Sequence, residues 1–267
     1  MKQYALVESF KGKKVFITGH TGFKGSWLAF LLHEMGAEVC GYALPPIGPL
    51  NHFEMLELET KIRHVAGDIR DAGRLSSELN LFQPEYVFHL AAQALVRPSY
   101  QDPATTFSTN LMGSVNLLDA VRSCDSVRSL VYVTSDKCYE NVEWVWGYRE
   151  TDQLGGRDPY SASKAAAEIA FTSYARSFFA QRSTLGAASA RAGNVIGGGD
   201  RAVDRIIPDC IRAIEANQPV NLRNPGATRP WQHVLEPILG YLMLAVRLYE
   251  EPKKWEGAWN FGPSTEE

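Results

Sequence analysis

Short apolar runs alternate with longer stretches of helical periodicity along most of this chain. The first run, at residues 14–18, predicts a buried strand, and a helix is expected over about 26–35. Because strand-like and helix-like stretches keep alternating, the pattern predicts an α/β fold, a doubly wound Rossmann-like parallel sheet with helices on both faces. Five further runs rich in β-forming residues predict strands at 38–42, 62–66, 86–90, 129–134 and 185–191, and longer helices are expected over about 104–122 and 160–179.

The alternation stops after the sixth predicted strand. Residues 193–200, with the sequence GNVIGGGD, predict a flexible loop, and a helical pattern over 206–216 follows. We expect a smaller C-terminal substrate-binding lobe here, of which the chain holds only a part, the remainder lying after residue 267. The expected boundaries are 1–192 for the dinucleotide-binding domain, 193–233 for the lobe, and 234–262 for a helix and a short strand that return to the first domain.

Composition and charge mainly exclude functions. Of the 267 residues, 45% are hydrophobic and 21% are charged, as in an ordinary globular protein. A net charge of -3 gives no electrostatic basis for binding nucleic acid or a membrane surface. No apolar run is long enough for a membrane span, and the first residues lack a signal-peptide core. The four cysteines lack metal-ligand spacing, so we expect no metal site, reduced thiols and a cytoplasmic location.

A glycine-rich turn lies between the first predicted strand and the first predicted helix. Without Cβ atoms, its backbone can approach a pyrophosphate placed at the positive end of the helix. The alternative is an ordinary strand-to-helix turn, but the strand before and the helix after favour a dinucleotide site. The candidate cofactor residues of this turn are Gly19, His20, Thr21, Gly22, Phe23, Lys24 and Gly25.

The residues expected around the ribose do not decide between NAD and NADP. The second strand ends at Tyr-Ala-Leu, without the carboxylate that usually binds the ribose hydroxyls. It has no arginine for a 2′-phosphate either, which leaves His20 or Lys24 as candidates, although Lys24 could equally be solvated. Asp68 and Ile69 are candidates to frame the adenine, and the alternative for Asp68 is a helix cap near Asp71.

Tyr160 and Lys164 are separated by about one helical turn, so both side chains lie on one face of the predicted helix. A nearby ammonium should lower the pKa of the phenol from about 10, and such a tyrosine can take a proton from an alcohol near neutral pH. The spacing alone is common on solvated helices. It gains weight from the glycine-rich turn in the same chain.

The tripeptide Ser135-Asp136-Lys137 follows the predicted strand 129–134. Ligands bind at the carboxyl edge of a doubly wound sheet, so these side chains are expected in one pocket with Tyr160 and Lys164. The alternative is a turn or a helix cap. Together the candidates supply a hydroxyl, a carboxyl, a phenol and two amines, which suffice for redox and acid–base steps.

These motifs together resemble the extended short-chain dehydrogenase/reductase family, and within it the sugar-nucleotide 4,6-dehydratases. Related dehydratases usually carry Thr-Asp-Glu where this chain has Ser135-Asp136-Lys137, a departure that is similar to the branch acting on CDP-glucose. The resemblance spans nearly the whole chain. It rests on GHTGFKGSWL at 19–28, HLAAQ at 89–93, TSDKCY at 134–139, WVWGYRE at 144–150, the Tyr-x-x-x-Lys pair at 160–164, RAGNVIGGGD at 191–200 and RPWQH at 229–233.

The resemblance implies an NAD cofactor, a nucleotide-sugar substrate and a homodimer or dimer of dimers built on the long helices. The alternative for those helices is that they merely cover the sheet. The choice of cytosine as the base rests on the resemblance alone. The implied cofactor residues outside the glycine turn are Asp68, Ile69, Leu90, Ala91, Ala92, Tyr160 and Lys164, and the implied substrate residues are Asn194, Arg205, Arg229 and His233.

The resemblance also implies a reaction. Tyr160, helped by Lys164 and Ser135, takes the proton of the carbon-4 hydroxyl while hydride passes to NAD⁺. Lys137 takes the carbon-5 proton and Asp136 protonates the carbon-6 hydroxyl, which leaves as water before hydride returns to carbon 6. Lys137 stands where a glutamate is usual and must be neutral to act as a base.

Three other functions remain open in the residues themselves. The chain could be another nucleotide-sugar 4,6-dehydratase, a 4-epimerase or reductase of the same family, or a cofactor sensor without catalysis. A 4-epimerase should lack an acid and a base beside Ser135, so Asp136 and Lys137 argue against it. A sensor usually loses the tyrosine or its lysine, and both are present here.

Overall fold

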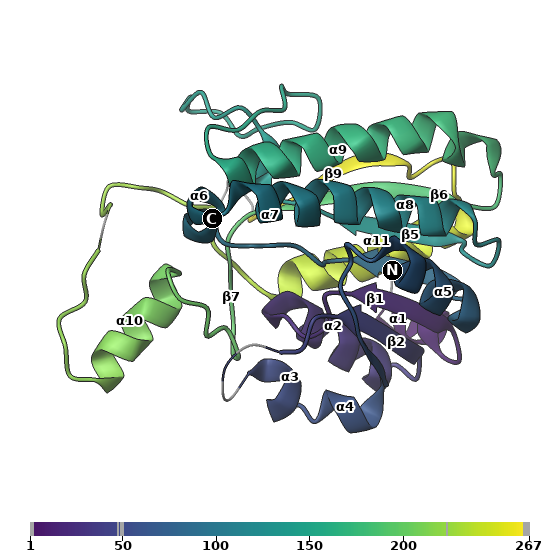
Figure 1. Ribbon diagram of the computed structural model, residues 1–267, viewed down its shortest axis with the longest axis horizontal. Coiled ribbons are helices and arrows are strands. Elements are labelled where there is room, and N and C mark those ends of the chain that lie inside the picture. Colours follow the sequence, from purple (N-terminus) through teal and green to yellow (C-terminus); the bar gives the residue numbers. More distant parts are fainter. Residues whose placement is uncertain (1–2, 47, 49–50, 223, 264–267) are drawn as a thin grey trace.

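A seven-stranded parallel sheet forms the centre of the computed structural model, which describes residues 3–46, 48, 51–222 and 224–263. The strand order is β3-β2-β1-β4-β5-β6-β9 (Figure 1). The chain therefore builds outward from β1 in one direction and from β4 in the other, which places the topological switch point between them. The strands are β1 Lys14–Thr18, β2 Glu38–Ala43, β3 Arg63–Ala66, β4 Tyr86–His89, β5 Ser129–Val133, β6 Gly186–Ala192 and β9 Gly257–Phe261. The predicted parallel sheet is confirmed.

Strand register brings three loops to one edge of the sheet. Thr18, the last residue of β1, is level with His89, the last residue of β4. His89 is in turn level with Tyr132, near the end of β5. The glycine loop, the loop after β4 and the tripeptide after β5 therefore begin side by side at the carboxyl edge.

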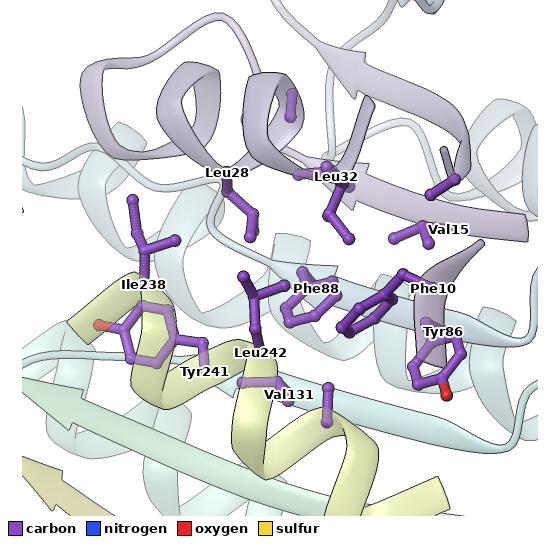
Figure 2. Packing of buried hydrophobic residues seen from close by; sticks show 14 of the residues in the cluster. Phe10, Val15, Leu28, Leu32, Tyr86, Phe88, Val131, Ile238, Tyr241 and Leu242 are labelled. Carbon is purple, nitrogen blue, oxygen red and sulfur yellow. The ribbon is translucent and has the colours of Figure 1, made fainter. Parts of the chain in front are cut away.

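Alternation along β1 explains why helices cover both faces. Val15 and Ile17 face a core shared with α1 (Gln3–Phe10), α2 (Phe23–Glu34) and α11 (Leu235–Glu250), whose packing Figure 2 shows. Phe16 points the opposite way, into a second core shared with α5 (Ala72–Phe82), α8 (Gly113–Arg122) and α9 (Pro159–Ser177). A strand that is buried on both faces has a continuous run of apolar residues, as β1 has at residues 15–17.

The helices differ from the prediction in two respects: one long helix is divided, and four short helices are added. The expected helix 104–122 is divided into α7 (Pro103–Phe107), a π-helical turn (Ser108–Met112) and α8. Asp71 caps α5 by accepting from the Arg74 backbone N–H at 3.0 Å, so the alternative that Asp68 is the cap is wrong. Four short helices were not predicted: α3 (His52–Met55), α4 (Leu58–Lys61), α6 (Val96–Gln101) and the N-terminal α1.

The segment after β6 is more ordered than its glycines predict. Residues 193–200 were expected to form only a loop, but β7 (Val195–Ile196) pairs in parallel with β8 (Gln232–His233). The partner strand lies far along the chain, so no local pattern could show the pairing. Between them, α10 (Ile206–Glu215) stands away from the body of the molecule in Figure 1. Within the described residues, no helix combines the length and apolarity needed to cross a membrane.

Candidate active site

The glycine loop joins β1 to α2, and its backbone is too closely packed for side chains at two positions. A Cβ on Gly19 would lie 2.7 Å from the backbone nitrogen of Ala91, and a Cβ on Gly25 would lie 2.1 Å from the Gly19 carbonyl oxygen. Gly22 is exposed instead, and among the described residues no side chain caps the helix that follows it. The open backbone N–H groups and the helix dipole fit the diphosphate of a dinucleotide.

This packing gives a first prediction. Gly25→Ala should lower the free energy of unfolding by about 2 kcal/mol or more, because the new methyl group meets backbone that cannot move aside. Gly22→Ala is the matched control, since its Cβ would approach the Gly19 carbonyl oxygen only to 3.4 Å. Urea unfolding measures both, and equal stability of the two variants would contradict the described loop.

His20 is turned into the protein. Its side chain is fully buried, and its Nε2 lies 2.7 Å from Nδ1 of His64. The ring fills the space beside Gly41, where a Cβ would come within 2.2 Å of it. Burial, together with His64, lowers the pKa of His20 to about 3, so the ring is neutral. The hypothesis that His20 contacts a 2′-phosphate is therefore wrong.

Lys24 extends from the same loop toward the catalytic candidates. Its Nζ lies 3.4 Å from the hydroxyl of Tyr241 on α11 and 5.7 Å from the centre of that ring. Burial first, and then the positive charges of Arg205 and Lys164, bring the pKa of Lys24 down to about 8. The carboxylate of Asp136 acts in the opposite direction. The amine of Lys24 therefore lies in the electrostatic field of the catalytic residues.

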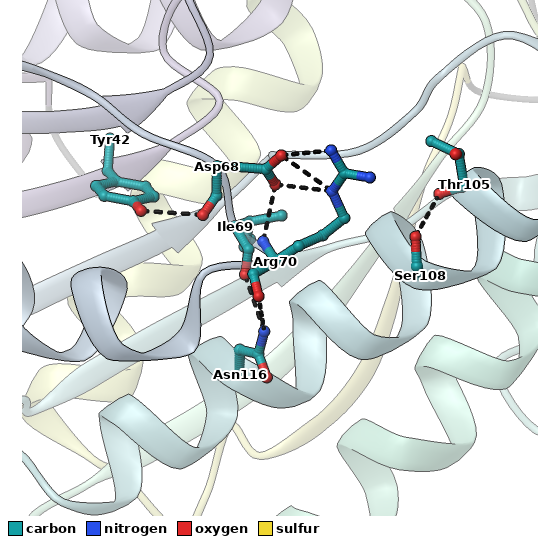
Figure 3. A network of polar contacts seen from close by, with 7 residues as sticks. All are labelled: Tyr42, Asp68, Ile69, Arg70, Thr105, Ser108 and Asn116. Carbon is teal, nitrogen blue, oxygen red and sulfur yellow. Dashed lines mark hydrogen bonds and ion pairs between the residues drawn. The ribbon is translucent and has the colours of Figure 1, made fainter.

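Asp68 and Ile69 follow β3 at the same sheet edge, in a polar network that Figure 3 shows. The Asp68 carboxylate accepts from Arg70 Nε at 2.9 Å, and its carbonyl accepts from the Tyr42 hydroxyl at 3.0 Å. Asn116 on α8 donates to the Ile69 carbonyl at 3.1 Å. Because Arg70 hydrogen-bonds it, the carboxyl of Asp68 has a lowered pKa. The network fixes the backbone that was expected to frame an adenine.

Leu90, Ala91 and Ala92 are half-buried in the loop after β4, beside the glycine loop. The backbone N–H of Leu90 donates to the Thr18 carbonyl at 3.0 Å. His89, just before them, bonds the Thr18 hydroxyl at 2.7 Å on one ring nitrogen and a serine of α8 at 3.0 Å on the other. His89 is therefore a core histidine with both ring nitrogens hydrogen-bonded.

Ser135 and Asp136 open a 3₁₀ turn (Asp136–Cys138) directly after β5. The Ser135 hydroxyl donates to Asp136 Oδ1 at 3.0 Å and accepts from the Lys137 backbone N–H at 3.3 Å. The serine thus caps the turn as well as facing the site. Asp136 and Lys137 are both half-buried. A Cβ on Gly193 would lie 3.4 Å from Asp136 Oδ2, so the carboxylate packs against the chain after β6.

Tyr160 and Lys164 lie one turn apart near the start of α9, and both are buried. Burial raises the pKa of Tyr160 to about 12, although a hydrogen bond with Ser135 and the charge of Arg205 oppose it. The predicted lowering of this pKa is therefore wrong, because removing the phenol from water outweighs the nearby charges. Burial also lowers the pKa of Lys164 to about 8.

Two of the four substrate candidates lie near the catalytic residues. Arg205 acts electrostatically on Tyr160, and its Nη1 pairs with Asp200 at 3.0 Å. Asn194 directly follows the glycine that packs against Asp136, and its carbonyl accepts from the Gln232 backbone N–H at 3.2 Å.

The other two candidates turn away from this cluster. Arg229 is exposed and donates to the carbonyl of Thr228. His233 is exposed, and its Nδ1 accepts from the Leu235 backbone N–H at 3.3 Å. The described structure does not bring either into contact with the catalytic candidates. Among the described residues, no group of three or more histidine, cysteine or acidic side chains is arranged to hold a metal ion.

Sequence reasoning missed two buried residues around this site. Tyr241, which contacts Lys24, lies more than 200 positions from it, and no local signal marks it. Glu168 lies four residues after Lys164, and this helical spacing, which places both side chains on one face of the helix, was a usable signal.

Known sequences similar to this chain include sugar-nucleotide dehydratases and an epimerase. The family model described as GDP-mannose 4,6 dehydratase matches residues 16–253. A CDP-glucose 4,6-dehydratase of Salmonella typhimurium is 53% identical over 262 residues, covering 97% of this chain and 73% of that protein. A CDP-paratose 2-epimerase of Salmonella typhi is 31% identical over 181 residues, covering 62% of this chain and 54% of that protein.

Solved structures share the fold. An epimerase from Methanothermobacter thermautotrophicus superimposes with a TM-score of 0.82 at 25% identity, covering 98% of this chain and 75% of that one. The protein MoeE5 in complex with UDP-glucose and NAD superimposes with a TM-score of 0.77 at 26% identity, covering 94% of this chain and 77% of that one.

Proposed function

Because the chain belongs to the GDP-mannose 4,6-dehydratase family, we propose that it is an NAD-dependent hydro-lyase that converts CDP-glucose to CDP-4-keto-6-deoxyglucose. One observation carries the proposal. The Ser135 hydroxyl donates to Asp136 Oδ1 at 3.0 Å, and Ser135 also opposes the rise in the pKa of Tyr160, so the serine links the alcohol-oxidising group to a carboxyl that can assist water loss. The 53% identity to a CDP-glucose 4,6-dehydratase supports the choice of substrate.

The cofactor would be held by three loops at the carboxyl edge. When bound, NAD⁺ supplies a positively charged hydride acceptor that can later give the hydride back. The glycine loop would bind its diphosphate through backbone N–H groups. We assign the remaining contacts to Asp68 and Ile69 after β3, to residues 90–92 after β4, and to Tyr160 and Lys164 on α9.

Tyr160 is the proposed base of the first step. It takes the proton of the carbon-4 hydroxyl while the hydrogen on carbon 4 leaves as hydride, so that a ketone forms. The raised pKa of Tyr160 makes its phenolate a strong base but a rare one in the protein alone. Ser135 and Lys164 would hold the hydroxyl and phenol in line, and added positive charge in the site would favour the phenolate.

Asp136 and Lys137 are the proposed acid and base of water loss. The carbon-4 ketone acidifies the proton on carbon 5, which Lys137 removes. Asp136 gives a proton to the carbon-6 hydroxyl, the carbon–oxygen bond breaks, and water leaves. The hydride taken from carbon 4 then returns to carbon 6 and a proton to carbon 5, so the reaction has no net redox change.

Three wider expectations belong to the proposal. The substrate nucleotide is assigned to Asn194, Arg205, Arg229 and His233, within a lobe formed in part by residues 193–233. The exposed apolar side chains of Met112, on the π-helical turn before α8, and of Ile169 on α9 support a homodimer or a dimer of dimers. Free cysteines support a cytoplasmic location, where the product would supply deoxysugars for surface polysaccharides such as lipopolysaccharide O-antigen.

A 4-epimerase is the second candidate, because one relative of solved structure is an epimerase. It would use the same tyrosine and glycine loop but would return hydride to carbon 4. Incubating the protein with NAD⁺ and CDP-, GDP-, dTDP- or UDP-hexoses separates the two. We expect CDP-glucose alone to give a keto product that absorbs strongly in alkali, whereas epimerised hexose without that absorbance would overturn the proposal.

Lys24 gives a prediction about cofactor binding. Lys24→Met should weaken NAD⁺ binding about tenfold, because a charge-assisted contact to the diphosphate is lost. The melting temperature should not fall, since the variant removes an amine that lies among other cations. Lys11→Met, at an exposed residue before β1, is the control. Isothermal titration calorimetry of NAD⁺ measures both, and unchanged affinity in Lys24→Met would contradict this contact.

A further inference from the structure

Glu168 is a buried carboxylate that the proposed mechanism does not use. It lies on α9 one turn after Lys164 and is 0% exposed. Its Oε2 accepts from Arg191 Nη2 at 2.7 Å and from the Ser189 hydroxyl at 2.8 Å. Its Oε1 accepts from the hydroxyl of Thr134, the residue directly before the catalytic tripeptide. The carboxylate therefore joins α9 to the end of β5 and to β6.

Arg191 extends the same network beyond the tripeptide. Its Nη1 donates to the Tyr139 hydroxyl at 2.8 Å and to the Glu150 carbonyl at 3.0 Å, and its guanidinium lies over the Tyr139 ring. The Tyr139 hydroxyl donates to Asn260 Oδ1 on β9 at 2.7 Å. Residues on both sides of Ser135-Asp136-Lys137 are thus fixed to one buried ion pair.

Stability alone is a weak reason for such a pair. Burying two charges costs several kcal/mol per ion, and well-packed apolar residues often serve as well or better. Removing only one partner is costly, because it leaves an uncompensated charge. The location of the pair, between the tripeptide and Lys164, points to a role in the site.

We propose that Glu168 is a positioning residue: its carboxylate fixes Thr134, and thereby the tripeptide after it, and supplies the negative charge that faces the Lys164 ammonium. The kinetic part of this proposal rests on the proposed function. The structural part concerns Lys164 itself and is tested without a substrate.

The charges around Lys164 set the direction of the effect. The pKa of Lys164 is lowered to about 8, because the effect of burial outweighs the opposite effects of Glu168 and Cys138. Lys24 and His89 also lie near Lys164. The positive charge of Lys164 lowers the pKa of each of them. Without the Glu168 carboxylate the pKa of Lys164 falls further, so Lys164 loses its proton at lower pH.

The experiment titrates Lys164 directly in Glu168→Gln. Lysine side chains are labelled with ¹³C, and the Lys164 resonance is identified by its loss in Lys164→Met. We expect its titration midpoint to fall by about one pH unit or more, the usual effect of a close opposite charge. In turnover of CDP-glucose, the alkaline limb of kcat should move to lower pH by the same amount.

Glu85→Gln is the matched control. Glu85 also accepts from a cation and a hydroxyl, Lys13 at 2.9 Å and Tyr249 at 2.8 Å, but it lies at the amino edge of the sheet, just before β4. That variant should lose stability without changing the Lys164 titration. A shift of Lys164 in Glu85→Gln equal to that in Glu168→Gln would overturn the proposal.

A second variant keeps the test decisive if Glu168→Gln does not fold. Glu168→Gln combined with Arg191→Met removes both charges of the ion pair, so the guanidinium is not left in the core without its carboxylate. The Lys164 midpoint should still fall. An unchanged midpoint in the folded variant overturns the positioning role. If the wild-type protein does not act on CDP-glucose, the proposed function fails, while a lowered midpoint still supports the role of Glu168.

Discussion

Tyr160→Phe is expected to abolish both reduction of the cofactor and formation of the keto sugar, with turnover lowered about 10²- to 10⁴-fold. The phenol is the proposed base for the carbon-4 hydroxyl, and the oxidation must precede every later step. The buried ring is kept in the variant, and only the hydroxyl is lost. Stopped-flow absorbance of the reduced nicotinamide, followed by product analysis, measures both signals.

Tyr86→Phe is the control for that experiment. Tyr86 is also a buried tyrosine, but it lies at the start of β4, at the opposite edge of the sheet, where it stacks on Tyr249. Its variant should turn over at the wild-type rate. A near-normal rate in Tyr160→Phe would exclude this tyrosine as the base.

Lys137→Ala should separate the two halves of the reaction. Carbon-4 oxidation should continue, because Tyr160 and the cofactor loops are unchanged. Water loss should fall about 10²- to 10⁴-fold, because the carbon-5 proton has lost its base. A single turnover should therefore accumulate reduced cofactor without the 6-deoxy product, as measured by absorbance and by NMR of the sugar nucleotide.

Lys254→Ala controls for the loss of a lysine at a surface ion pair, where little change is expected. If Lys137→Ala loses cofactor reduction together with dehydration, the lysine acts before the elimination step. That result would contradict its assignment as the carbon-5 base.

Much of the fold follows from local patterns in the sequence. The runs that became β1 and β4 are short, apolar and β-rich because both faces of each strand are buried. The glycine loop was recognisable because Gly19 and Gly25 have no room for a Cβ in a tight turn. In the same way, Tyr160 and Lys164 are placed together by the helix itself, so their spacing carried information.

What could not be predicted depends on contacts between distant segments. The direction of the Lys24 side chain depends on Tyr241 of α11, and the burial of His20 depends on His64 of β3. The pKa of Tyr160 depends on how completely the surrounding elements exclude water, which helical spacing does not show. A pattern identifies neighbours within an element, whereas packing between elements sets the electrostatics of the site.

The central claim is that hydride leaves carbon 4 and returns to carbon 6 of the same sugar. CDP-glucose carrying deuterium at carbon 4, incubated with the protein and NAD⁺, tests it most directly. We expect a 4-keto product whose new methyl group at carbon 6 holds the deuterium, as seen by NMR and mass spectrometry. Deuterium retained at carbon 4 of an epimerised hexose, or a methyl group without deuterium, would contradict it.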